Sequence, residues 1–94
     1  MDDLLLSKIR LAVVAELLAS EWASFSELQK SVGATNGNLS SHLGKLVESG
    51  YVEEEKLFLD RRPHSRYRLT SLGRERMIAH VRSLQILLEK EPQS

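Results

Sequence analysis

Residues 35–52 read TNGNLSSHLGKLVESGYV, and this stretch decides the fold. Thr35 is a residue that caps helices, and Gly50 supplies a left-handed stop after a helix that runs to Ser49. Four apolar residues between these caps share one helical face, at spacings of four, three and one: Leu39, Leu43, Leu46 and Val47. The stretch therefore predicts an amphipathic helix whose apolar face points into a core.

The opposite face of this predicted helix is small and polar. It carries Gly37, Asn38, Ser41, Gly44, Lys45 and Glu48, with Ser40 and His42 on its flanks and Asn36 at the exposed N-terminus. The two glycines each cost the helix about 1 kcal/mol relative to alanine, yet they face away from the core. Asn and Lys can read base edges, Ser and the N-terminal amides can hold phosphates, and a helix fits the DNA major groove. The alternative is a solvated face rich in Ser and Asn.

A second, short helix is predicted directly before this one. Ser26 is placed to cap it, Gln29 stands at the capping-box position, and Gly33 ends it. Residues 22–25 form a short extended link in front of it. Two short helices joined by a tight turn that contains glycine indicate a helix-turn-helix.

A β-hairpin is predicted after the two helices. Residues 51–59 and 65–69 have strand-like composition. The loop between them carries a basic tip that has no apolar role: Arg61, Arg62 and His64. Such a tip can reach phosphates or the minor groove beside a recognition helix, and the alternative is an ordinary solvated turn.

Arg66 and Arg68 alternate with Tyr67 and Leu69 along the second strand, so we expect the arginines to point away from the core. Two roles are open to them. They can contact DNA, or they can pair across the hairpin with an acidic block on the first strand: Glu53, Glu54 and Glu55.

A final helix is predicted from Thr70, its N-cap, to about Lys90. Four of its apolar residues follow at steps of four, three and four, the spacing of a seam between two helices: Met77, Val81, Leu84 and Leu88. Residues 4–19 predict a first helix that is apolar almost all round and is therefore covered on two sides. The predicted homodimer interface comprises Leu5, Ile9, Met77, Val81, Leu84 and Leu88; packing of the last helix on the first within one chain is the alternative.

The composition fits one small domain, residues 1–94, that is mainly α with a small β-hairpin (α+β), and residues 70–90 are its predicted dimerisation helix. The net charge is zero, but residues 56–76 hold seven basic and two acidic side chains, so one face can still attract phosphates. The chain has no cysteine, no apolar run of membrane-spanning length, no glycine-rich phosphate loop and no nucleophile placed beside a base. We therefore expect a soluble, cytoplasmic protein that is not an enzyme and holds no cofactor and no metal.

Three stretches resemble the winged-helix transcription regulators of the MarR and ArsR families: RLAVVAEL (10–17), FSELQKSVGATNGNLSSHLGKLVESGYVEEEK (25–56) and YRLTSLGR (67–74). The resemblance implies the order helix, strand, helix, helix, strand, wing, strand, helix. It also implies that the helix at about 35–49 enters the major groove of double-stranded DNA, that a wing at about 59–65 contacts the flanking backbone or minor groove, and that the terminal helices dimerise. The cysteine-based metal sensing of many ArsR proteins is not inherited.

The residue pattern and the resemblance together predict a homodimer that binds a palindromic operator and regulates transcription, with two recognition helices about 34 Å apart. The predicted DNA contacts are Thr35, Asn36, Gly37, Asn38, Ser40, Ser41, His42, Lys45, Arg61, Arg62, His64 and Arg66. The alternatives are a winged helix that binds another protein and an architectural protein that binds DNA without sequence preference.

Overall fold

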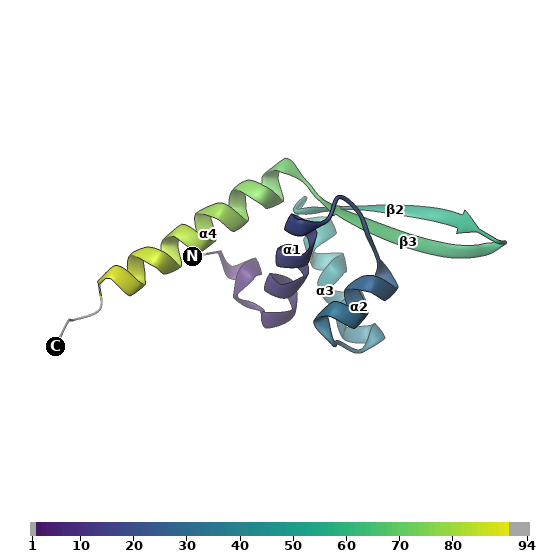
Figure 1. Cartoon of the computed structure of the whole chain (residues 1–94), viewed down its shortest axis with the longest axis horizontal. Coiled ribbons are helices and arrows are strands. Elements are labelled where there is room, and N and C mark those ends of the chain that lie inside the picture. The colour runs from purple at the N-terminus through teal and green to yellow at the C-terminus, as the bar shows by residue number, and fades with distance from the viewer. Residues whose placement is uncertain (1, 91–94) are drawn as a thin grey trace.

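A computed structural model describes residues 2–90, and its elements follow the predicted order (Figure 1). They are the 3₁₀ turn η1 (Asp3–Leu6), helix α1 (Lys8–Ala19), strand β1 (Ala23–Ser24), helices α2 (Phe25–Val32) and α3 (Asn36–Glu48), strands β2 (Val52–Leu59) and β3 (Arg62–Leu69), and helix α4 (Ser71–Glu89). Helices α1 to α3 form a body from which the hairpin projects at one end and α4 at the other, so the molecule measures 61 × 25 × 21 Å. This is the winged-helix arrangement that the sequence predicts.

None of the helices between residues 2 and 90 combines the length and the apolar character that crossing a bilayer needs. The core instead lies between α1, α2, α3 and the inner end of the hairpin. Its largest fully buried side chains come from all of these elements and from η1: Leu5, Val13, Val14, Leu17, Leu28, Leu39, Leu46 and Val52. The predicted apolar face of α3 is therefore confirmed.

Both ends of α3 form as predicted. The Thr35 hydroxyl accepts a hydrogen bond from the Asn38 backbone N–H (3.2 Å). At the other end Gly50 has φ of 81°, its N–H donates to the Val47 carbonyl (3.0 Å), and the Tyr51 N–H donates to the Leu46 carbonyl (2.9 Å). This pair of bonds is the Schellman arrangement, which needs a residue that tolerates positive φ.

Helix α2 begins two residues earlier than predicted. Its N-cap is Ser24 and not Ser26, because Ser24 accepts from the Glu27 N–H (3.1 Å) while the Glu27 carboxylate accepts from the Ser24 N–H (2.9 Å). A glutamate completes this capping box at the position where the sequence analysis placed Gln29. The helix ends at Gly33, with φ of 72°, as predicted.

The first helix is shorter than the predicted span of residues 4–19. Ser7 adopts an extended backbone, and its hydroxyl accepts from the Arg10 N–H (3.3 Å), so α1 begins only at Lys8. The preceding leucines form η1, which buries Leu5 and exposes Leu6. A serine side chain that competes for the backbone has divided the apolar segment into two elements.

The sheet has the order β1-β3-β2 and is antiparallel throughout, with Ala23 opposite Tyr67 and Val52 opposite Leu69. Strand β3 begins at Arg62 and not at the predicted residue 65, so Arg62 and His64 belong to a strand. The reason is a two-residue turn, Asp60–Arg61, in which both residues have positive φ (50° and 63°) and whose handedness matches the twist of the strands.

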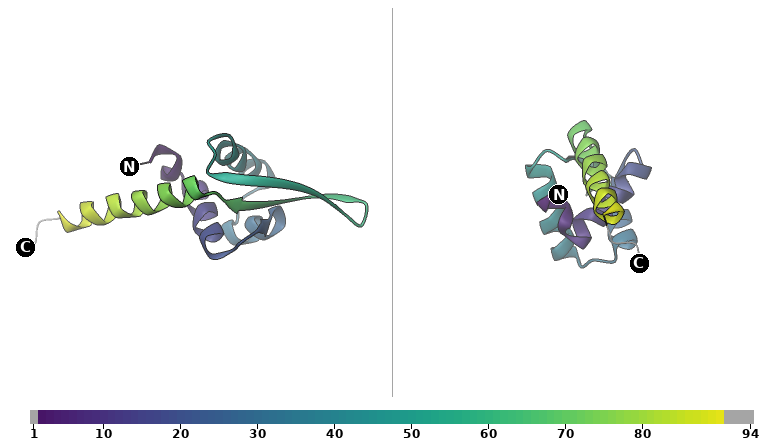
Figure 2. Two further views of the ribbon diagram at one scale, coloured as in Figure 1. Left: turned by 90° about the horizontal axis from the view of Figure 1, so that it is seen from above. Right: turned by 90° about the vertical axis from the view of Figure 1, so that its left-hand side faces the viewer.

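Helix α4 is fixed to the body near its start and near its middle. Gly73 lies so close to Tyr51 that a Cβ atom would stand 2.2 Å from the Tyr51 carbonyl oxygen. Further along, the buried His80 accepts at Nδ1 from the Asp2 N–H (3.3 Å), and the Asp2 carboxylate accepts from the Tyr51 hydroxyl (2.5 Å). Burial and the neighbouring Asp2 raise the pKa of Tyr51 to about 12, so its hydroxyl stays a donor. Figure 2 shows α4 continuing along the long axis, away from this attachment.

Candidate nucleic-acid interface

The outer face of α3 is uncovered along its whole length. Seven of the eight predicted contacts at this helix are exposed: Thr35, Asn36, Gly37, Asn38, Ser40, Ser41 and Lys45. Among them the Thr35 hydroxyl caps the helix, and the Asn36 side-chain oxygen accepts from the Gln29 amide. The Asn36 amide nitrogen remains a donor. The face therefore presents short hydrogen-bonding groups with little bulk.

Gly37 and Gly44 widen this face in a way that the chain itself does not require. A Cβ atom built on either glycine would meet no other atom within 4 Å. Gly44, which lies in the interior of the helix, nevertheless costs it about 1 kcal/mol relative to alanine. The space above α3 is thus kept open at a measurable cost in helix stability.

His42 is half-buried at the edge of this face, and its environment makes it neutral. Its Nδ1 lies 2.9 Å from Nη1 of Arg10, which can only donate. Burial, followed by the charges of Arg10 and Lys45, lowers the pKa of His42 below its ordinary value. With Nδ1 accepting, the remaining proton is on Nε2, so His42 offers a neutral donor and not a cation.

Arg10 is a residue that the sequence analysis missed. It lies on α1, and its Nε also donates to the Leu4 carbonyl (2.6 Å), so one guanidinium joins η1, α1 and α3. The signal for it was an arginine between Ile9 and Leu11, inside a mainly apolar helical segment. Its hydrogen bond to Nδ1 orients the His42 ring and links α3 to α1.

The arginines of the hairpin divide into two groups. Arg61 and Arg62 are exposed at the tip, together with His64. Arg66 pairs with Glu55 across the hairpin (2.7 Å), and its guanidinium lies over the Trp22 ring at 4.1 Å from the centroid. Of the two roles open to Arg66, the structure therefore shows the cross-strand pair.

Arg68 repeats this arrangement nearer the body. It pairs with Glu53, and its guanidinium lies 4.9 Å from the centroid of the same Trp22 ring. The remaining acid of the block, Glu54, accepts from the buried Tyr67 hydroxyl (2.7 Å). Burial and this neighbouring carboxylate raise the pKa of Tyr67. All three glutamates thus have partners inside the hairpin.

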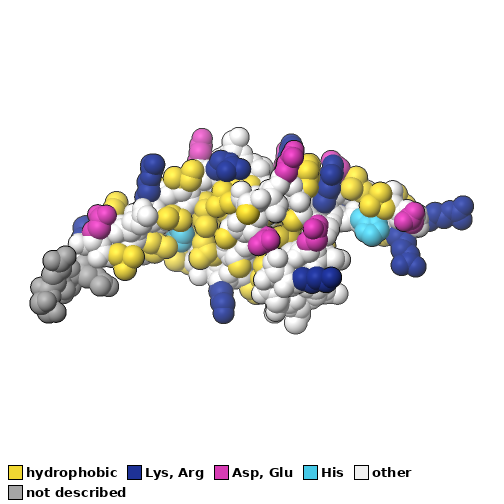
Figure 3. All heavy atoms as spheres, in the orientation of Figure 1, with side chains coloured by type: hydrophobic (Ala, Val, Ile, Leu, Met, Phe, Trp, Pro, Cys, Tyr) yellow, Lys and Arg dark blue, Asp and Glu magenta, His cyan; other side chains and the backbone are white. Residues whose placement is uncertain are grey.

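The charge that remains on the outer part of the hairpin is positive. Residues 56–65 contain three basic side chains and one acidic one: Lys56, Arg61, Arg62 and Asp60. Figure 3 shows basic side chains projecting from this end of the molecule, with apolar ones beside them. The neutral total charge of the chain therefore conceals a basic wing.

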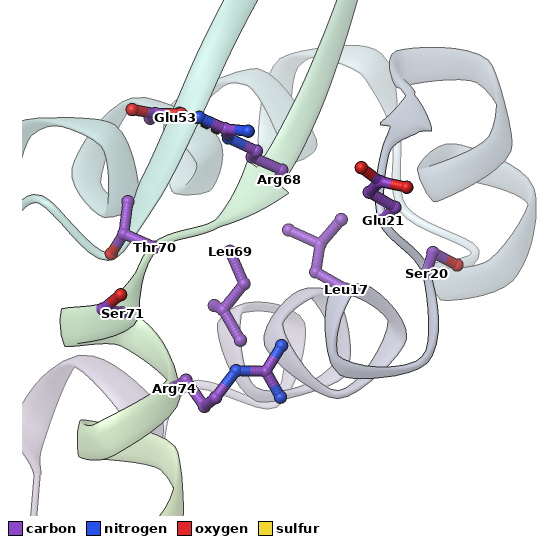
Figure 4. A pocket seen from close by; sticks show the side chains of 9 residues that line it. All are labelled: Leu17, Ser20, Glu21, Glu53, Arg68, Leu69, Thr70, Ser71 and Arg74. Atoms are coloured by element: carbon purple, nitrogen blue, oxygen red, sulfur yellow. Dashed lines mark hydrogen bonds and ion pairs between the residues drawn. The ribbon is translucent and has the colours of Figure 1, made fainter.

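A hollow of about 520 Å³ lies between α1, β3 and the first turn of α4. Figure 4 shows Arg68 turned toward Glu53 at its rim, while Arg74 lies apart from that pair, near α1. The lining also includes Glu21, so two arginines are balanced by two glutamates. This hollow does not extend the basic surface of the wing.

The predicted dimer seam is divided by the structure. Leu5 and Met77 have exposed fractions of 1% and 7%, so the chain's own core already covers them. Farther along α4, Val81, Leu84 and Leu88 are exposed. Ile9 is partly buried against the core. One stripe of α4 therefore packs on the body in its first half and becomes exposed in its second half, partly at Val81 and Leu84 and most at Leu88.

Residues 9–88 match the winged helix DNA-binding domain family, and the chain belongs to that family. Over 68 residues it is 35% identical to an uncharacterized protein of Methanocaldococcus jannaschii, a match that covers 72% of this chain and 74% of the relative. The resemblance that the sequence analysis drew is thus confirmed at the level of the family.

Solved structures agree with this assignment. A transcriptional regulator homologue from Pyrococcus horikoshii is 32% identical, with a TM-score of 0.84 over 92% of this chain and 85% of that one. A MarR-family transcriptional regulator from Silicibacter pomeroyi is 26% identical, with a TM-score of 0.65 over 96% of this chain and 62% of that one. The family and fold are those of transcriptional regulators, which are not enzymes.

Proposed function

We propose that this chain binds a specific double-stranded DNA sequence as a homodimer and thereby regulates transcription. The observation that carries the proposal is the outer face of α3, which is uncovered, small and polar and contains two glycines that the chain does not need. Close approach of another molecule accounts for those glycines. A helix fits the major groove, and the donors of this face suit base edges and phosphates.

The proposed contacts fall into two groups. On α3 they are Thr35, Asn36, Gly37, Asn38, Ser40, Ser41, His42 and Lys45. On the wing they are Arg61, Arg62 and His64, which lie on the part of the hairpin whose charge is positive. Arg66 is left out because its guanidinium is already held by Glu55 and Trp22.

The exposed half of α4 supports dimerisation. Val81, Leu84 and Leu88 continue the stripe that Met77 begins, and on this 19-residue helix the body covers only the first part of it. Two chains related by a two-fold axis could pack these stripes against each other, and none of the proposed DNA contacts would be buried in that interface. The chain would then be one domain, residues 1–94, with 70–90 as its dimerisation helix.

The first experiment is selection of bound duplexes from a randomised DNA pool by the purified protein at moderate salt. We expect enrichment of a palindrome whose half-sites lie about one helical turn, roughly 34 Å, apart. Binding without enrichment would support an architectural protein instead. Absence of binding would favour a protein partner, although the internal pairing of Glu53, Glu54 and Glu55 leaves little free acidic surface for one.

Gly44→Ala tests the face of α3 with two effects of opposite sign. Because a Cβ meets nothing there, the free protein should be more stable by up to about 1 kcal/mol in a thermal melt. Because the methyl group intrudes on the DNA, affinity for the selected duplex should fall roughly tenfold, as for an added group in a closely packed contact. Ser31→Ala, exposed on α2, is the control and should leave affinity unchanged. Tight binding by the stabilised variant would show that DNA does not approach Gly44.

A further inference from the structure

The end of the hairpin carries apolar side chains that no part of the body covers. Phe58 is 77% exposed, the highest exposed fraction among the large exposed apolar residues between residues 2 and 90, and Leu59 is 53% exposed. Neither belongs to the hydrophobic core or packs against it. Exposed apolar side chains that are grouped at the far end of a projecting hairpin mark a surface that can contact another molecule.

The register of the hairpin gives Phe58 a defined neighbour. Leu59 is opposite Arg62, so Phe58 lies opposite Pro63, and directly opposed residues point to the same face of a hairpin. The same face carries Val52 and Tyr67 at the inner end, where it packs into the core. The apolar pair therefore lies on the core-side face after that face has left the body.

The shape and charge around this pair indicate what it contacts. The two-residue turn limits the tip to two residues, and from this tip single side chains can enter the minor groove, which is about 6 Å wide. Lys56 lies on the same face as the pair, Arg62 lies on the opposite face, and Arg61 lies in the turn, against the single acid Asp60. This local excess of positive charge attracts a polyanion. Phenylalanine and proline are among the side chains that wedge between base steps in that groove.

We propose that Phe58, backed by Pro63, inserts between two base pairs in the minor groove flanking the α3 site and bends the DNA there. This inference rests on the proposed DNA binding and adds a deformation of the duplex to it. The wing would then distinguish sequences by how easily the flanking step unstacks, with pyrimidine–purine steps favoured.

The test compares Phe58→Ala with Leu59→Ala. Both remove an exposed apolar side chain from β2, but Leu59 points to the opposite face, beside Arg62. The probe is the duplex enriched by the wild-type protein, with 2-aminopurine placed in turn at each flanking position. We expect its fluorescence to rise at one flanking step with wild type and with Leu59→Ala, and not with Phe58→Ala.

Affinity of Phe58→Ala for this duplex should fall roughly tenfold, within the range of a lost aromatic contact to a base, while the sequence selected by α3 stays the same. Its thermal melt should match that of wild type because the ring is exposed. A signal that survives in Phe58→Ala, or one that is absent with wild type, would overturn the wedge and leave the proposed operator binding intact. A wild-type protein that enriches no duplex would overturn both.

Discussion

Gly73→Ala is expected to lower the stability of the protein by about 3 kcal/mol, the upper end for an overpacked site. The added Cβ would stand 2.2 Å from the Tyr51 carbonyl oxygen and 2.7 Å from a methyl group of Leu69. The carbonyl cannot easily withdraw, because it accepts a hydrogen bond from the Thr70 N–H (3.0 Å). For a chain of this size the loss should lower the melting temperature by roughly 15 °C, measured by circular dichroism.

Gly44→Ala is the matched control for this experiment. It is the same substitution inside a helix, but in open space, and its melting temperature should not fall. If Gly73→Ala melted with the wild type, the close approach of α4 to Tyr51 would be contradicted.

Leu84→Glu is expected to convert the dimer to a monomer and to weaken operator binding by roughly 100-fold or more, the usual loss when two linked half-sites are uncoupled. A glutamate in the uncovered stripe would place an unpaired charge against its two-fold mate. Sedimentation measures the mass, and titration of the selected duplex measures the affinity. Because Leu84 is already 37% exposed, the monomer should remain folded.

Ile86→Glu controls for the added charge. Ile86 is also exposed, but it lies on a different side of α4 from Leu84, since residues two apart on a helix do not share a face. We expect this variant to sediment as a dimer and to bind as wild type. If the Leu84→Glu protein were still a dimer, the assignment of this stripe to the dimer interface would be wrong.

The element order and most helix ends could be predicted because each depends on a few neighbouring residues. The capping bonds of Thr35, Thr70, Gly33 and Gly50 are made to backbone groups within five positions of these residues. The error at α2 arose where two serines, each followed three residues later by a side chain able to close the capping box, competed. Neighbouring residues therefore limit where a helix can begin, but they do not always determine which of two possible N-caps is used.

The hairpin turn could not be predicted from composition. Turns of this handedness favour Asn and Gly, whereas Asp60–Arg61 adopts it without either. Since the turn sets the register, the partners of Arg66 and Arg68 also stayed open until the turn was known. The exposed Phe58 was missed for a different reason, because composition does not show that the outer part of its strand lies beyond the body.

Contacts between residues that lie far apart in the sequence could not be predicted from local patterns. Arg10 and His42 are 32 positions apart, and no local pattern joins them. Periodicity showed which residues of α4 share a stripe, but not that Met77 lies on the body while Leu88 lies past its edge. The DNA contacts and the dimer seam remain predictions, with Arg66 reassigned to the hairpin.

Helix α4 meets the body at Gly73 in its first turn, and the hydrogen bond between Asp2 and His80 sets the direction in which the helix continues from there. Its 19 residues span about 28 Å at about 1.5 Å each. A tilt of about 10° at its first turn would move the far end by about 5 Å, which exceeds the 3.4 Å rise of one base pair. In the proposed dimer, the hydrogen bond between Asp2 and His80 would then help to set the distance between the two recognition helices. The half-site spacing that the dimer prefers would depend on residues that do not contact DNA.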